Sequence, residues 1–95
     1  MEVKELRSGL LDYWVARAEG IMLLEGQEYS PSTDWSVGGP IIDKHEIGIS
    51  PLRGTWFAAG VEASYELQEG DTALIAAMRF RVAKTYGRDV PDVEN

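Results

Sequence analysis

The chain has 95 residues, no cysteine and a formal net charge of −7 at pH 7. This length predicts a single globular domain over residues 1–95, with a flexible tail over residues 88–95. The lack of cysteine excludes disulfides and thiolate chemistry, and the acidic balance disfavours direct nucleic-acid binding, which needs clustered cations. No apolar run approaches the roughly 20 residues that cross a bilayer, so we expect no membrane contact.

The first predicted element is a helix over residues 9–19. Its apolar side chains recur at helical spacing: Leu10, Leu11, Trp14, Val15 and Ala18. Ser8 is its expected N-cap and Gly20 its expected terminating glycine. Residues 21–24 form an apolar run that is too short for a helix and predicts a buried strand.

Residues 29–40 are rich in Ser, Thr, Pro, Asp and Gly, which predicts a loop. Because proline suits the first helical position, residues 40–46 predict one helical turn that begins at Pro40. Residues 47–49 and 55–58 predict strands, separated by a turn over residues 50–54.

A further strand is predicted where apolar and polar residues alternate. The apolar members are Val61, Ala63, Tyr65 and Leu67. The apolar face changes across Gly60, which we therefore expect in a bulge or a turn.

The last predicted helix begins at residues 70–72, is capped by Asp71 and stops at Gly87. Its buried stripe is Leu74, Ile75, Met78 and Val82. Its later turns carry Arg79, Arg81 and Lys84, which the helix dipole favours there. The predicted fold class is α+β, with two amphipathic helices packed on a small, mostly antiparallel sheet.

The loop over residues 29–40 is the best candidate for a ligand or partner site. Its candidate residues are Tyr29, Ser32, Thr33, Asp34, Trp35, Gly38 and Gly39. An indole offers a stacking surface, adjacent glycines let backbone N–H groups approach a ligand, and a carboxylate accepts hydrogen bonds. The same residues can instead cap a turn, fill the core and permit a tight turn. The sequence leaves both interpretations open.

The remaining polar clusters predict no chemistry. His45, beside Asp43 and Glu46, is the one histidine of a chain without cysteine, and we expect a solvated segment rather than a metal site. We expect no catalytic residue, no metal and no cofactor. The three tryptophans exceed what a core this small buries easily, which favours an interface and a homo-oligomer, most commonly a symmetric dimer.

Several segments together resemble the NinX-like family of small phage proteins. They are residues 11–20 (LDYWVARAEG), 29–35 (YSPSTDW), 38–42 (GGPII), 74–79 (LIAAMR) and 82–83 (VA). The Ser-Thr-Asp-Trp…Gly-Gly-Pro loop is the most specific part. The resemblance implies a phage or prophage accessory protein of unknown activity in the bacterial cytoplasm, and it carries over no catalytic residue.

Two functional hypotheses follow from these observations. The first is a non-enzymatic binding module that modulates a host protein, with a defence component as one candidate partner. The alternative is a small-molecule or nucleotide-binding domain that sequesters its ligand through Trp35 and Gly38-Gly39. An exposed apolar surface would favour the first, and a concave site containing Trp35 and Asp34 would favour the second.

Overall fold

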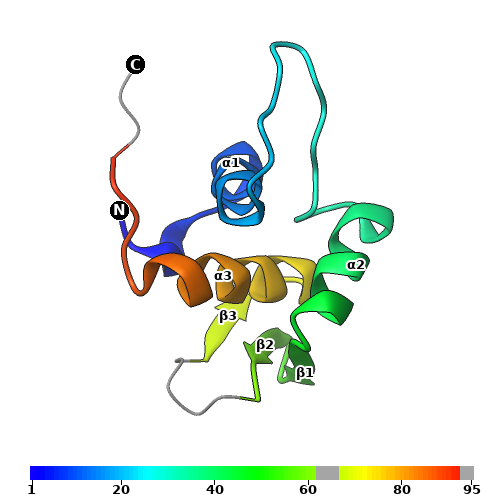
Figure 1. Ribbon diagram of the computed structural model, residues 1–95. Helices are drawn as coiled ribbons and strands as arrows, with labels where there is room; N and C mark the ends of the chain where they lie inside the picture. Colours follow the sequence, from blue (N-terminus) through cyan, green and yellow to red (C-terminus); the bar gives the residue numbers. More distant parts are fainter. Residues whose placement is uncertain (62–66, 93–95) are drawn as a thin grey trace.

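The computed structural model of the protein describes residues 1–61 and 67–92 (Figure 1). In chain order its elements are the 3₁₀ helix η1 (Val3–Glu5), α1 (Ser8–Glu19), α2 (Trp35–Lys44), β1 (Gly48–Leu52), β2 (Thr55–Ala59), β3 (Gln68–Gly70) and α3 (Ala73–Tyr86). The strands form one antiparallel sheet in the order β1-β2-β3. The predicted α+β class is therefore confirmed.

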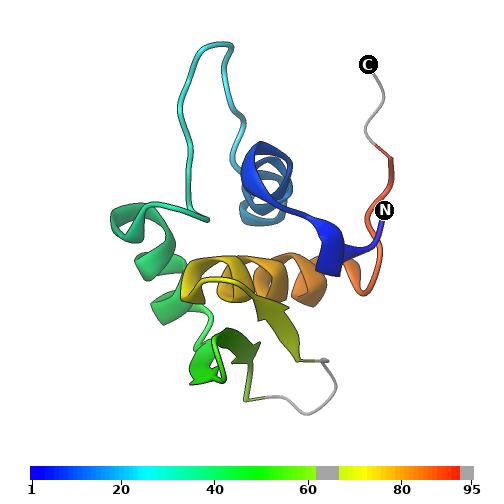
Figure 2. The same cartoon turned by 180° about the vertical axis from the view of Figure 1, so that it is seen from behind.

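Helix α3 is the centre of the fold. It contacts α1, α2 and all three strands, and it lies between α1 and the sheet in two opposite views (Figures 1 and 2). Because it is covered on several sides, α3 is apolar over most of its surface, and Ala76, Ala77 and Met78 are fully buried. Leu11 and Val15 of α1 complete the core on one side of it.

Both predicted helices are confirmed, but their predicted N-caps are wrong. Arg7 holds the cap position of α1, and Ser8 is already its first helical residue. In α3 the cap is Thr72, whose hydroxyl accepts the Ile75 N–H at 3.1 Å. A hydroxyl three residues before that N–H fits capping geometry, and Asp71 stands one residue too early for it. The predicted glycine ends at Gly20 and Gly87 are confirmed.

Helix α2 corrects the prediction for residues 29–46. The loop ends at Asp34, the helix starts at Trp35, and Pro40 lies inside the helix rather than at its first position. Gly38 and Ile41 of this helix are buried. Packing therefore outweighs the poor intrinsic helix propensity of the Gly-Gly-Pro sequence.

The β1–β2 hairpin closes through a two-residue turn, Arg53-Gly54, narrower than the predicted turn over residues 50–54. Both turn residues have positive φ, 53° and 82°, as the favoured hairpin turns require. Pro51 belongs to β1, which is an edge strand and needs no N–H there.

The predicted strand of alternating residues is wrong where the structure describes it. Val61 and Leu67 are exposed and lie outside any strand, and β3 occupies residues 68–70 instead. Ala63 and Tyr65 lie outside the described residues. Gly60 directly follows the last residue of β2.

Two further segments differ from the prediction. Residues 21–24 are not a buried strand but part of the loop between α1 and α2 (residues 20–34), which projects beyond α1 and is called the projecting loop (Figure 1). At the other end, Val90 is buried and its N–H donates to the Met1 carbonyl at 2.9 Å. The Val3 N–H likewise donates to the Arg88 carbonyl at 2.8 Å, so the predicted tail is wrong for residues 88–90.

The neighbouring glycines of α2 provide a matched test of its packing. A Cβ at Gly38 would lie 2.4 Å from the Pro31 carbonyl oxygen and 2.7 Å from Leu74 Cδ2, whereas a Cβ at Gly39 makes only an ordinary contact with Trp35 at 3.9 Å. We expect Gly38→Ala to lower the free energy of unfolding by about 1–3 kcal/mol. Gly39→Ala should raise it by up to about 1 kcal/mol, since alanine favours helix.

Urea denaturation of the two variants measures this difference. Equal effects of the two substitutions would contradict the close approach of α2 to Pro31.

Candidate functional site

Two of the predicted site residues stand at the start of α2. Asp34 caps the helix: its Oδ1 accepts the Ser36 N–H at 2.9 Å and the Ser36 hydroxyl at 2.7 Å. These hydrogen bonds lower the pKa of the Asp34 carboxyl. Trp35 does not fill the core, because its side chain is 54% exposed. Its indole is thus available to solvent, while Asp34 has a structural role.

The two predicted glycines are helical rather than part of an open loop. The Gly38 N–H donates to the Asp34 carbonyl at 2.9 Å, inside α2. Gly38 is buried against Pro31 and Leu74, and Gly39 lies beside Trp35. Close packing is therefore the role the structure gives to Gly38.

Ser32 joins this region to α1. Its N–H donates to Asp12 Oδ1 at 2.9 Å, and both residues are buried. The Ser32 hydroxyl is also buried, and it has no hydrogen-bond partner among the described residues. The Asp12–Ser32 bond fixes the returning end of the projecting loop to α1.

Tyr29 and Thr33 line a hollow of about 540 Å³ between this loop and α1. The α1 side of the hollow includes Ser8, Asp12 and Tyr13. Burial raises the pKa of the Tyr29 hydroxyl, and the negative charges of Glu19 and Asp12 add to the effect. Tyr29 therefore stays a neutral hydroxyl. Asp34, Trp35 and the glycines do not line this hollow.

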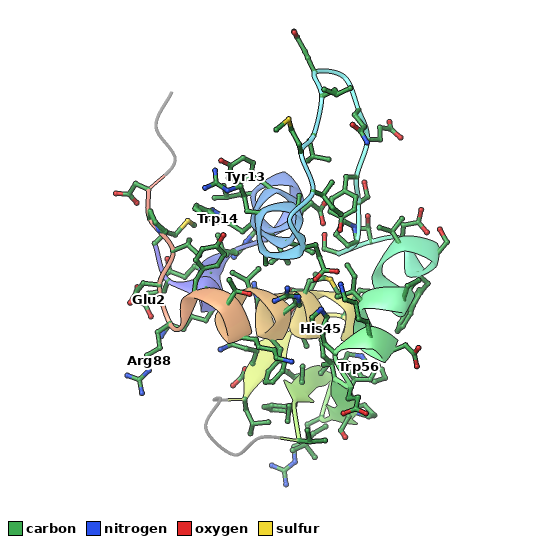
Figure 3. All side chains as sticks on the ribbon, in the orientation of Figure 1. Glu2, Tyr13, Trp14, His45, Trp56 and Arg88 are labelled. Carbon is green, nitrogen blue, oxygen red and sulfur yellow. The ribbon has the colours of Figure 1, made fainter. Side chains whose placement is uncertain are left out.

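A buried charge cluster that the sequence prediction missed is centred on Glu19, the last residue of α1. Arg81 Nε donates to Glu19 Oε2 at 2.6 Å, and His45 Nε2 lies 2.9 Å from the same oxygen. Arg81 also donates to the Ala18 carbonyl and the Thr85 hydroxyl. The cluster thus joins the ends of α1 and α2 to the middle of α3, and His45 lies beside α3 (Figure 3).

The predicted solvated segment is confirmed for Asp43 and Glu46, which are exposed, but is wrong for His45, whose side chain is only 15% exposed. Arg81 lies on a later turn of α3, as predicted, but the sequence did not predict that its side chain, 8% exposed, pairs with a buried carboxylate. Burial lowers the pKa of His45 despite the opposing effect of Glu19, while hydrogen bonds from Arg81 and His45 outweigh burial and lower the pKa of Glu19.

An exposed apolar surface lies on the first part of the projecting loop, directly after α1. Met22 is 85% exposed and Leu24 70%, and Ile21 is 37% exposed. The turn after them is held by two contacts between Leu24 and Gln27, with the Gln27 N–H donating to the Leu24 carbonyl and the Gln27 side chain accepting the Leu24 N–H. We call residues 21–24 the apolar segment.

Within the described residues no helix combines the length and the apolarity needed to traverse a bilayer. Within residues 1–61 and 67–92, the His, Asp and Glu side chains form no group of three or more that could hold a metal ion.

Removing the buried Glu19–Arg81 pair should cost far more unfolding free energy than removing the exposed contact between Lys44 and Glu19. Glu19→Ala leaves the Arg81 guanidinium buried without its counter-ion and should lower the free energy of unfolding by about 3–5 kcal/mol. Lys44→Ala is the control, because Lys44 is 65% exposed and reaches Glu19 only at 3.5 Å, and it should change stability by less than about 0.5 kcal/mol.

Chemical denaturation of both variants and of Glu19→Ala/Arg81→Ala tests the pair. The loss in the double variant should be smaller than the sum of the single losses. Additive losses would contradict direct coupling between the two groups.

The same cluster predicts weaker folding in acid. The pKa of His45 is lowered in the folded state. As the pH falls below the ordinary value of 6.5, the unfolded chain therefore binds a proton before the folded chain does, and the free energy of unfolding decreases. The lowered pKa of Glu19 adds a second loss as the pH falls below its ordinary value of 4.5. His45→Gln should flatten the first part of the stability curve and leave the second.

Thermal denaturation between neutral pH and acid measures this profile. An unchanged slope near pH 6.5 in His45→Gln would show that His45 is not linked to folding.

A family model described as "Bacteriophage P22, NinX" matches residues 21–85, about two thirds of the chain. The chain therefore belongs to this phage protein family, which confirms the resemblance seen in its sequence. The match contains the projecting loop, α2, the sheet and nearly all of α3, whereas α1 precedes it. No curated protein matches the chain.

Proposed function

We propose that this NinX family protein is a non-enzymatic binding module that modulates a host protein in the cytoplasm of the infected bacterium, and that the apolar segment docks into that protein. The observation that carries the proposal is the exposure of Met22 and Leu24, at 85% and 70%, on a loop that projects from the helices (Figure 1). Exposed apolar side chains that gather on one element mark interaction sites more often than singly scattered ones do.

The energetics suit recognition by a partner. Burying a methionine or leucine side chain gains about 1.5–3 kcal/mol, so a groove that takes both residues gains about 3–6 kcal/mol before the cost of association. The backbone entering the segment is already fixed, because the Gly20 and Ile21 N–H groups donate to carbonyls of α1 at 3.2 and 2.8 Å. This fixed start reduces the ordering entropy that binding must overcome.

Charge indicates the kind of partner. Glu25 follows the apolar segment directly, Glu28 comes three residues later, and the whole chain carries a net charge of −7. A partner groove with an apolar floor and a basic rim complements both features and gains association rate from them. A host defence component with such a groove is one candidate.

A second hollow, of about 450 Å³, lies at the base of the apolar segment. Tyr13 and Arg17 of α1 form one side of it, and Ile21 and Met22 form part of the other. The Arg17 guanidinium lies over the Tyr13 ring at 5.9 Å, which leaves a flat rim against which a partner side chain can pack.

The alternative, a ligand sequestered by Trp35 and Gly38-Gly39, has weaker support. The exposed indole is compatible with ligand stacking, but the Gly38 N–H is already bonded within α2 and Gly38 is packed against Pro31. Protein binding through the apolar segment therefore accounts for more of the exposed features.

The partner surface can be tested by site-specific photo-crosslinking. A crosslinker at position 22 should capture one host polypeptide from infected cells, and a crosslinker at exposed Leu52 in the β1–β2 hairpin should not. With that polypeptide purified, Met22→Glu/Leu24→Glu should weaken binding by about 100-fold or more, since both apolar contacts are lost. Leu52→Glu, an equally drastic change on another surface, should leave the affinity within about twofold.

Circular dichroism confirms that each variant is folded. Equal capture at positions 22 and 52, or undiminished affinity of the double variant, would rule out the apolar segment as the docking surface.

A further inference from the structure

We infer that the hollow between α1 and the projecting loop binds an uncharged, polyhydroxylated small molecule, a nucleoside or a sugar. The hollow lies beside Tyr29 and Thr33 and is separate from Trp35 and Gly38-Gly39. This inference is independent of the proposed partner surface, because the apolar segment contributes only Leu23 to the hollow. Its volume, about 540 Å³, lies within the usual range for small-molecule sites.

The walls of the hollow that α1 and residues 29–34 form are held in place by hydrogen bonds that need no ligand. Asp12 Oδ1 accepts the Ser32 N–H at 2.9 Å, which ties the loop to α1. The Thr33 and Asp34 N–H groups both donate to the Ser30 carbonyl, at 3.2 and 2.8 Å, and so fold the loop into a tight turn. Tyr29 packs against the core cluster. The groups that these contacts order lose little entropy on binding.

The lining chemistry selects the ligand class. Among the described residues that line the hollow, Asp12 carries the only formal charge, and it is negative, which disfavours phosphates and other anions. Around it lie hydroxyls of Tyr29 and Thr33 and the amide of Gln27, which can donate as well as accept. A carboxylate among neutral donors and acceptors complements adjacent hydroxyl groups of a ligand.

Aromatic and apolar groups provide the remaining contacts. Tyr13 and Tyr29 line the hollow together with Leu23, which offers ring and aliphatic surface to the carbon face of a sugar or to a base. A compact mixture of a few convergent polar groups with apolar surface is the usual composition of a small-molecule site. A simple amine would satisfy Asp12 but leave these hydroxyls and rings unused.

Ligand-observed NMR and ¹H–¹⁵N spectra of the full chain test the inference with defined probes. The probes are adenosine, uridine and glucose, with adenosine 5′-monophosphate and spermidine as charged comparisons. We expect at least one uncharged probe to produce saturable shifts at Asp12, Gln27 and Thr33 at millimolar concentrations or below. The monophosphate should bind more weakly than adenosine, because its charge faces Asp12.

Three substitutions in the hollow have a matched control outside it. Asp12→Asn keeps an oxygen that can accept the Ser32 N–H, Tyr29→Phe keeps the packed ring, and Thr33→Val alters an exposed residue. Each should weaken binding about tenfold, the effect of one lost hydrogen bond to a ligand. Tyr86→Phe removes a tyrosine hydroxyl that does not line this hollow and should change the dissociation constant by less than about twofold.

Thermal denaturation shows which variants remain folded, and Thr33→Val keeps the test decisive if the substitution at Asp12 or Tyr29 unfolds the chain. The inference is overturned if no uncharged probe binds. It is equally overturned if the monophosphate or spermidine binds more tightly than every uncharged probe, or if the shifts fall outside the hollow.

Discussion

The carboxylate of Glu19 is the point at which the three α-helices of this fold are joined. It ends α1, accepts from Arg81 of α3 at 2.6 Å, and lies 2.9 Å from His45 at the end of α2. A buried carboxylate requires such partners, because an unpaired charge away from water is strongly destabilising. The chain therefore leaves α1 at a fixed point, and the Asp12–Ser32 bond fixes it again before α2 begins. Between these points residues 21–28 project from the helices, whereas Tyr29 packs against the core cluster and Pro31 lies against Gly38.

The elements that depend on local patterns could be predicted from the sequence. Apolar periodicity and terminating glycines predicted α1 and α3, and β-prone residues around a turn predicted the hairpin. Only the second half of helix α2 was predicted, as a turn that begins at Pro40. Its first half, from Trp35, could not be predicted, because Gly-Gly-Pro is typical of a loop and only tertiary packing of Gly38 against Pro31 overrides that preference. The apolar run at residues 21–24 was wrongly predicted to be a strand because apolar character does not by itself show what covers a segment.

The candidate site was predicted less completely than the fold. The sequence identified the loop over residues 29–40 as a candidate site but left two roles open for it, capping and ligand binding. Asp34 is a helix cap in the structure. The Glu19–Arg81 pair joins residues 62 positions apart, a separation at which no sequence pattern identifies a partner. Exposure of Met22 and the hollow beside Tyr29 likewise depend on how α1 and the loop face each other. Both proposed surfaces therefore became visible only in three dimensions.

Amide hydrogen exchange of the wild type and of Glu19→Gln tests most directly whether a rigid frame carries a separate projecting loop. We expect slow exchange in α1, α2 and α3 and fast exchange at residues 22–28 in the wild type. In Glu19→Gln, protection should fall together at the ends of α1 and α2 and around Arg81, while the loop remains as fast as before. Slow exchange in the loop, or a loss confined to α1, would contradict the role assigned to Glu19.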